Sequence, residues 1–244
     1  MAEKLPILVY HRVHLDDDVT EPNDGGRTDL TLFTQQMKYL KEEGFQTVTY
    51  KEIESWLYDG DELPERAVAI DFDDNRLNVM ENACPVLDVL GFVATIFVIT
   101  DLASGKNLSG MAGHPALDWK HLEELRDKGW CISPHTVKHL YLAGPEHLPR
   151  NEAELMSELV DSRREVEERL GIEAPNFAYP CGSWNDEVET RVKEIYRTAR
   201  HWHLVDKGPW LLNRRETNPY RLAAINMCNA MPLETFKDLI DSSK

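Results

Sequence analysis

The chain has 244 residues, and its 27 Lys and Arg residues against 43 Asp and Glu residues give a formal net charge of -16. No block of basic residues interrupts this acidic background, which argues against nucleic acid or an anionic membrane as a partner. The 4 cysteines are far apart, without a C-x-x-C pair, which argues against a disulfide framework and against a cysteine zinc site.

Apolar runs of strand length alternate with patterns of helical spacing along the first half of the chain. The apolar spacing at 33–40 predicts a helix, and Gly44 is a typical helix end. Strands are predicted at 6–10, 47–49, 67–72 and 94–99, with further short helices at 53–57 and 82–90. Aperiodic polar segments at 16–29 and 105–113 are predicted to be loops.

Polar residues also mark the expected helix starts in the second half of the chain. The predicted N-caps are Asp118, Asn151 and Asn185. The helix that follows Asn151 is predicted to be the longest and to end at Leu170. Strands are predicted at 130–133, 176–179 and 222–227, with another beginning at 198, and the last helix at 233–240.

The alternation of strands and helices, about seven times along the chain, predicts an α/β fold with parallel strands. Because no Gly-rich phosphate loop follows the first strand, we expect a distorted (β/α) barrel of about seven or eight strands. The length fits one such barrel, so residues 1–244 are expected to form a single catalytic domain. The apolar run at 5–9 is too short for a signal peptide and no stretch reaches transmembrane length, so we expect a cytoplasmic protein without a membrane span. Nothing in the sequence indicates the oligomeric state.

The third predicted strand ends in a cluster of carboxylates. This cluster consists of Asp71, Asp73 and Asp74. Three acids within four positions repel one another unless a cation, a proton or an arginine lies among them. His135 and His139 have the four-residue spacing that places both imidazoles on one face of a helical turn. Two histidines and one carboxylate leave a coordination position open, as in catalytic zinc sites. The sequence therefore predicts a hydrolytic metal site.

Several polar segments each follow a different predicted strand, namely His11, Asp73 with Asp74, His135 and 180–182. The C-terminal ends of the strands in a β/α barrel share one face, and that face carries the active site. We therefore expect these segments to converge on one pocket. For His11, lining of that pocket and a structural hydrogen bond are equally compatible with the sequence.

These motifs resemble those of the polysaccharide deacetylases, the NodB-homology family also called carbohydrate esterase family 4. The D-F-D-D sequence at 71–74 is similar to the family's T-F-D-D, with Asp in place of Thr. The H-T-V-K-H sequence at 135–139 matches H-[ST]-x-x-H, and A-Y-P-C-G at 178–182 stands where the family has R-x-P-Y-G. The opening Y-H-R-V at 10–13 and the third-motif variant resemble most the branch that acts on poly-N-acetylglucosamine.

The resemblance implies one divalent metal ion, with zinc expected first and cobalt or nickel as alternatives. The implied metal ligands are Asp74, His135 and His139. Asp73 is implied as the general base toward a metal-activated water, and the backbone N–H of Cys181 as a donor to the tetrahedral oxyanion. The predicted substrate contacts are Tyr179, Pro180 and Trp184.

The chain departs from the family where proton transfer is concerned. The third-motif arginine, which orients the base in the family, is Ala178 here, and an arginine often found in the C-terminal strand is Ala224. The family's late L-x-H histidine is not matched by 225–227. The arginines available as replacements near the C-terminus are Arg214, Arg215 and Arg221. The histidines available as proton donors to the leaving group are His11, His201 and His203.

The function implied by the resemblance is removal of N-acetyl groups from an N-acetylated sugar or glycan, by attack of a metal-activated water that releases acetate. One alternative is a hydrolase of another amide, such as a cyclic imide or ureide, which small soluble substrates would distinguish. A second alternative, suggested by the missing acid and arginines, is a pseudoenzyme that binds metal and glycan without releasing acetate.

Overall fold

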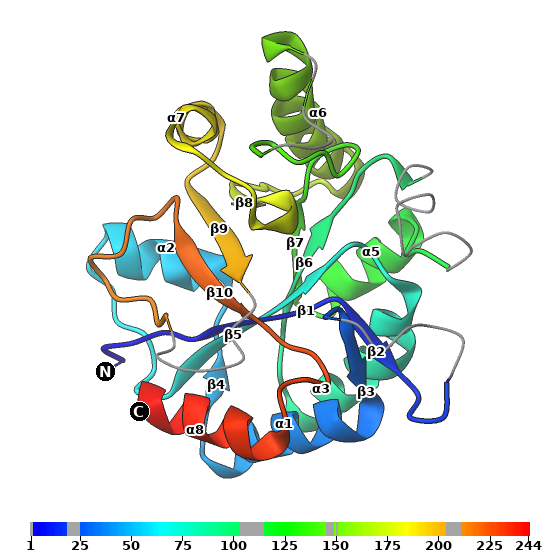
Figure 1. Ribbon diagram of the computed structural model, residues 1–244, viewed down its shortest axis with the longest axis vertical. Helices are drawn as coiled ribbons and strands as arrows, with labels where there is room; N and C mark the ends of the chain where they lie inside the picture. The colour runs from blue at the N-terminus through cyan, green and yellow to red at the C-terminus, as the bar shows by residue number, and fades with distance from the viewer. Residues whose placement is uncertain (1, 19–24, 103–114, 145–148, 150, 204–210) are drawn as a thin grey trace.

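The computed structural model describes residues 2–18, 25–102, 115–144, 149, 151–203 and 211–244. Its parallel strands form a nearly closed barrel in the order β7-β6-β5-β1-β10-β9-β8, with β4 beside β5 (Figure 1). The barrel strands are β1 Ile7–Tyr10, β4 Gln46–Thr47, β5 Ala67–Asp73, β6 Thr95–Val98, β7 Cys131–Pro134, β8 Asn176–Ala178, β9 Thr198–His203 and β10 Leu222–Asn226. A second, two-stranded sheet pairs β2 Arg12–His14 with β3 Arg27–Asp29. The predicted distorted (β/α) barrel is confirmed.

Helices surround the barrel in Figure 1. They are α1 Leu30–Glu42, α2 Tyr50–Tyr58, α3 Cys84–Leu90, α5 Trp119–Asp127, α6 Glu152–Leu170, α7 Asp186–Ile195 and α8 Leu233–Ser243. Asp118, Asn151 and Asn185 are N-caps as predicted, and each side chain accepts a hydrogen bond from a backbone N–H in the first turn of its helix. Among the described helices, none combines the length and the apolar character needed to cross a lipid bilayer.

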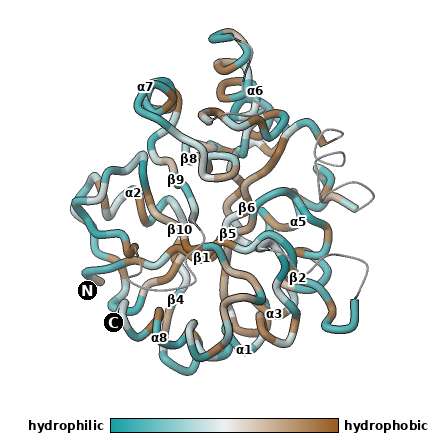
Figure 2. The backbone as a smooth tube through the Cα atoms, in the orientation of Figure 1, coloured by the Kyte–Doolittle hydropathy of each residue, from teal (hydrophilic) through white to brown (hydrophobic). Residues whose placement is uncertain are grey.

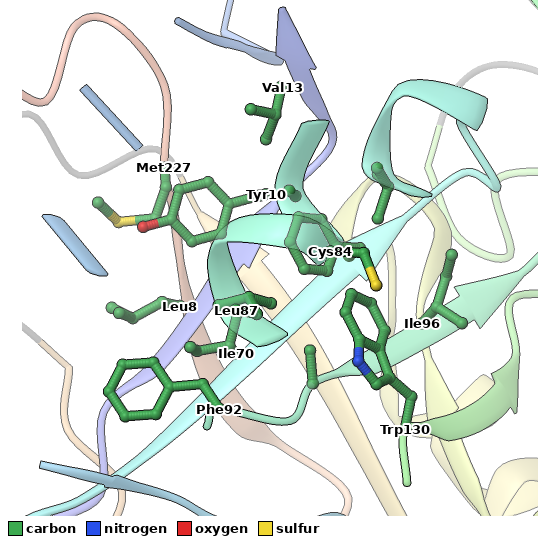
Figure 3. Close-up of a cluster of buried hydrophobic side chains, with 14 of the residues drawn as sticks. Leu8, Tyr10, Val13, Ile70, Cys84, Leu87, Phe92, Ile96, Trp130 and Met227 are labelled. Atoms are coloured by element: carbon green, nitrogen blue, oxygen red, sulfur yellow. The ribbon is translucent and has the colours of Figure 1, made fainter. Parts of the chain in front are cut away.

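Alternate residues of the central strands contribute to two separate cores, because successive side chains of a strand point to opposite faces. In β1, Ile7 and Val9 pack inside the barrel, whereas Leu8 and Tyr10 pack in the outer layer beneath the helices. Figure 3 shows part of this outer layer, which also holds Trp130. In Figure 2 the hydrophobic colour follows the central strands and the hydrophilic colour lies mainly on the periphery. Burial on both faces is typical of parallel strands and explains their continuous apolar runs.

Outside the candidate site, two local predictions were wrong. The segment 16–29, predicted to be a loop, ends in β3, a short strand whose polar residues give no apolar signal. The strand predicted at 47–49 ends earlier because Thr49 is the N-cap of α2 and forms a capping box with Glu52. The loop predicted at 105–113 lies outside the described residues.

Candidate active site

The turn after β5 carries two of the predicted site residues. Asp73 ends the strand, and Asp74 and Asn75 follow with φ of 75° and 49°. Asp and Asn enter this left-handed region at lower cost than other residues with a Cβ. The buried Asn75 amide accepts a hydrogen bond from Ile99 N at 2.7 Å and donates one to Ile99 O at 2.8 Å. The turn is thereby attached to the chain after β6, and both carboxylates stay at the C-terminal end of the barrel.

The segment 135–139 follows β7 as a loop, so the predicted helical turn was wrong. Thr136 has a φ of 66° and His139 a φ of 58°, which is incompatible with a right-handed helix. The Thr136 hydroxyl accepts a hydrogen bond from His139 N at 2.9 Å and closes the loop. The two imidazole centroids lie 4.9 Å apart. The loop therefore brings both rings together, as the helical spacing was expected to do.

Glu158 of α6 holds this histidine loop from behind, and the sequence analysis did not identify it. Its side chain is 2% exposed on a helix otherwise rich in solvated charges. One carboxylate oxygen accepts hydrogen bonds from Val137 N at 2.9 Å and Lys138 N at 2.8 Å. Two charge-assisted bonds to consecutive N–H groups fix the backbone between the two histidines.

We expect Glu158→Ala to weaken zinc binding by about 10- to 100-fold, because groups that orient metal ligands typically contribute that much to affinity. Isothermal titration calorimetry on the metal-stripped protein measures this change. Glu165→Ala, on the exposed side of the same helix beside Arg169, is the matched control and should bind zinc as the wild type does. Equal affinities for both variants would mean that the loop keeps its shape without Glu158.

Asp74, His135 and His139 come together as predicted, with one potential ligand atom from each residue within 4.8 Å of the others. Asp74 Oδ1 lies 3.3 Å from His139 Nε2 and 3.8 Å from His135 Nε2. This oxygen is buried and forms no conventional hydrogen bond with the described residues. One carboxylate and two imidazoles that converge on one point fit a divalent transition-metal ion.

His135 is prepared to act as a neutral ligand. Its Nδ1 lies 2.8 Å from the carbonyl oxygen of Ala178, which can only accept a hydrogen bond. Nδ1 therefore carries the proton, and the lone pair of Nε2 faces Asp74. Burial lowers the pKa of His135 to about 4 despite the nearby carboxylates, so the imidazole is neutral at pH 7. The same hydrogen bond joins β7 to β8, the two ends of the strand order.

The other two ligands favour their charged forms in the absence of an ion. Burial opposes ionisation of Asp74, but the nearby charge of His139 outweighs it and holds the pKa of Asp74 well below its usual range. Burial likewise opposes protonation of His139, but Asp74 outweighs it and raises the pKa of His139. A metal ion at this site would therefore compete with a proton for His139.

Arg200 of β9, like Glu158, contacts the site but was not predicted from the sequence. Its side chain is fully buried inside the barrel, where Nη2 donates to Asp73 Oδ1 and Nε donates to Asp71 Oδ2 at 2.8 Å. Arg200 is the register partner of Ala178, so it lies on the strand next to the position where the family has its arginine. An arginine inside an otherwise buried strand is rare and was the available signal.

The C-terminal arginines considered as replacements lie elsewhere. Arg221 pairs with the exposed Asp186 and the buried Glu189 of α7, and Arg215 donates to Asp61 O at 2.6 Å. Burial opposes ionisation of Asp73, but nearby positive charges outweigh it, and Arg200 has the largest effect among them. The pKa of Asp73 is therefore lowered, and the carboxylate is charged at pH 7. Arg200 thus supplies the positive charge that the acid cluster requires.

The turn at 180–182 packs closely against β9. Cys181 has a φ of 52° and Gly182 a φ of 64°, and a Cβ on Gly182 would lie 2.5 Å from the carbonyl oxygen of Trp202. Only glycine fits at that position. Pro180 is buried in the same turn. The turn is therefore held in one conformation beside the carboxylates, whose charges raise the pKa of Cys181 together with burial, the larger cause.

The remaining predicted site residues have varied surroundings. Tyr179 is fully buried, and its hydroxyl donates to Tyr220 O at 3.3 Å, so its ring supports the turn from the core side. Trp184 is partly buried, with the Arg221 guanidinium 4.1 Å from its ring centroid and the ring of His201 at 5.9 Å. The side chain of His203 lies outside the described part of the chain.

His11 lies beside the carboxylates. Burial raises the pKa of Asp73 and Asp74, and the charge of His11 is among the influences that oppose it, after Arg200 at Asp73 and His139 at Asp74. Its ring meets Trp202 edge-on at a centroid distance of 5.6 Å. Its Nδ1 is buried and has no hydrogen-bond partner among the described residues. The described residues therefore show no structural hydrogen bond to His11 Nδ1, one of the two alternatives that the sequence left open.

Comparison with known proteins decides the family. The family model described as polysaccharide deacetylase matches residues 60–199, a range that contains all three motifs. The chain belongs to the polysaccharide deacetylase family. The Bacillus subtilis protein YxkH, named for the same family, is 32% identical over 224 residues, which cover 88% of this chain and 72% of YxkH.

Other relatives of this polysaccharide deacetylase include a poly-beta-1,6-N-acetyl-D-glucosamine N-deacetylase of Staphylococcus aureus, 29% identical over 166 residues. That match covers 66% of this chain and 56% of the relative, so it spans about half of that protein. The deacetylase PplD of Streptococcus pyogenes, solved with acetate, has a TM-score of 0.80 at 23% identity and covers 98% of this chain and 99% of its own. IcaB from Ammonifex degensii has a TM-score of 0.79 at 22% identity, with 98% of both chains covered. These structures share the fold.

Proposed function

We propose that this polysaccharide deacetylase is a metal-dependent N-deacetylase, which hydrolyses the acetamide of an N-acetylated glycan to a free amine and acetate. The observation that carries the proposal is the arrangement of Asp74, His135 and His139 around one point, with the charged Asp73 beside them. Oligomers of β-1,6-linked N-acetylglucosamine are the first substrate to test, because the Staphylococcus aureus relative is named for that polymer. A single catalytic domain over residues 1–244 stays a prediction.

A divalent ion held by these ligands supplies Lewis-acid chemistry, which acidifies water and polarises a carbonyl. Asp73 is the proposed general base, and its two oxygens have different tasks. Oδ1 accepts the Arg200 hydrogen bond, whereas Oδ2 is buried, accepts no hydrogen bond from the described residues and lies 3.9 Å from His135 Nε2. Oδ2 is therefore the atom available to take a proton.

Two further groups complete the proposed reaction. The backbone N–H of Cys181, in the turn held against β9, is the proposed donor to the oxyanion, a task that does not use the thiol. His11 is the proposed proton donor to the leaving amine, because it lies near both carboxylates. His201 packs against Trp184, on the face of β9 opposite Arg200. Undiminished acetate release by His11→Ala would exclude His11 from this role.

We expect metal removal to abolish acetate release, and addition of zinc, cobalt or nickel to restore it, with zinc as the expected physiological ion. The measurement is acetate released from N-acetylglucosamine oligomers by stripped and reloaded protein. Release without any metal would contradict the proposal. Metal and glycan binding without release from any substrate would indicate a pseudoenzyme, and turnover of cyclic imides alone would indicate the other amide hydrolase.

A further inference from the structure

Asp71 is an unexpected residue for the inside of this barrel. The family motif has a neutral threonine at this position, whereas Asp71 adds a second carboxylate two residues before Asp73. Both are completely buried, and burial, as the largest cause, raises the pKa of Asp71 to about 6. A buried carboxylate close to another one is unfavourable unless its partners compensate for it. The groups that compensate for the charge of Asp71 therefore indicate its role.

Two donors meet at one oxygen of Asp71. Arg200 Nε donates to Oδ2 at 2.8 Å, and the Tyr50 hydroxyl donates to the same atom at 2.9 Å. The guanidinium of Arg200 also lies 4.4 Å from the ring centroid of Phe97, and this ring meets Tyr50 edge-on at 5.4 Å. The guanidinium is therefore fixed by a carboxylate at Nε, a second carboxylate at Nη2 and an aromatic face.

Tyr50 is held independently of the site. It is the first residue of α2, where the capping box of Thr49 and Glu52 fixes the start of the helix. Tyr50, Ile53 and Trp56 pack against the core inside the barrel. The hydroxyl of Tyr50 is thus presented to Asp71 from a fixed helix, and a chain of hydrogen bonds runs from this helix through Asp71 and Arg200 to Asp73.

We propose that Asp71 and Tyr50 are positioning residues, which hold the Arg200 guanidinium so that it occupies Asp73 Oδ1 and leaves Oδ2 without a hydrogen bond from the described residues. This inference rests on the proposed deacetylase function. A guanidinium bonded to Asp73 alone could rotate about its terminal bonds, whereas bonds at both Nε and Nη2 fix its plane. In this chain Asp71 replaces the usual threonine, and its partner Arg200 lies one strand away from the usual arginine position.

The first test compares Asp71→Asn and Tyr50→Phe with Tyr10→Phe. Tyr10 is the matched control, because it is fully buried and donates a similar hydrogen bond to Gln36 at 2.9 Å in the outer core. We expect kcat for acetate release to fall by about 10-fold or more in Asp71→Asn, and less in Tyr50→Phe, with KM and zinc affinity unchanged. Tyr10→Phe should retain the wild-type kcat. Equal kcat in all three variants, or a fall in zinc affinity that matches the fall in kcat, would overturn the proposal.

A double-mutant cycle with Arg200→Lys tests whether Asp71 acts through Arg200. If it does, Asp71→Asn costs much less kcat in the Arg200→Lys background than in the wild type. Fully additive effects would mean that Asp71 acts by another route. This separates positioning from general loss of stability, which would add in both backgrounds.

A third measurement needs neither substrate nor metal. The Nε–H proton of Arg200 should exchange slowly with solvent in the NMR spectrum of the wild type and of Tyr10→Phe, and faster in Asp71→Asn. Unchanged exchange in Asp71→Asn would contradict the inference even if the wild type is active. Slow exchange in a wild-type protein that releases no acetate, together with faster exchange in Asp71→Asn, would retain the role of Asp71 in holding the Arg200 guanidinium while rejecting the proposed function.

Discussion

Asp73→Asn is expected to reduce kcat for acetate release by about 10³-fold, because a positioned general base contributes about 10²- to 10⁴-fold to rate. The asparagine keeps the shape of the side chain and can still accept the hydrogen bond from Arg200. It cannot take the proton. Steady-state kinetics on zinc-loaded protein measure the change, with KM expected near the wild-type value.

Zinc affinity separates the general base from a metal ligand in this variant. Asp73→Asn should bind zinc nearly as the wild type does, whereas Asp74→Asn should lose most of its affinity because Asp74 Oδ1 faces both imidazoles. Asp127→Asn, an exposed aspartate that pairs with Arg126, is the control and should be fully active. Full activity of Asp73→Asn would place the base elsewhere, and loss of zinc would make Asp73 a ligand.

Arg200→Met is expected to lower the free energy of unfolding by about 3–5 kcal/mol, the usual cost of breaking a buried ion pair by removing one partner. Asp71 and Asp73 would both remain buried without their common cation. Urea denaturation at pH 7, followed by circular dichroism, measures this loss. Methionine has a similar length and no charge, so lost packing contributes little.

Arg221→Met is the matched control for this stability measurement. Arg221 also bridges two carboxylates, but its side chain is 36% exposed and one partner, Asp186, is 90% exposed. Its other partner, Glu189, also binds Lys193. Glu189 is 3% exposed but keeps Lys193 as a partner, so the loss should stay below about 1 kcal/mol. Similar losses in both variants would mean that the buried charges relax or take up protons without cost.

The residues whose convergence was predicted correctly are those encoded by short, contiguous motifs. Asp74, His135 and His139 come together as their motifs implied, and Asp73 lies beside them. Their strands are buried on both faces, so continuous apolar runs marked where each strand ends and the functional residue begins. The helical turn expected at 135–139 was wrong, because two left-handed residues can bring the same two rings together as a helix does.

Apolar periodicity was therefore enough to predict the barrel, and three short motifs carried the resemblance to the family and the prediction that Asp74, His135 and His139 converge, since these features depend on neighbours along the chain. The residues that support the motif were decided by tertiary structure. Arg200 reaches Asp73 from 127 positions away, and Glu158 reaches Val137 from a helix whose other charges are solvated. Which buried arginine meets which carboxylate depends on strand register and on the packing of helices against the barrel. Neither leaves a local pattern in the sequence, because the contact forms only when distant segments are brought together by the burial of their apolar faces.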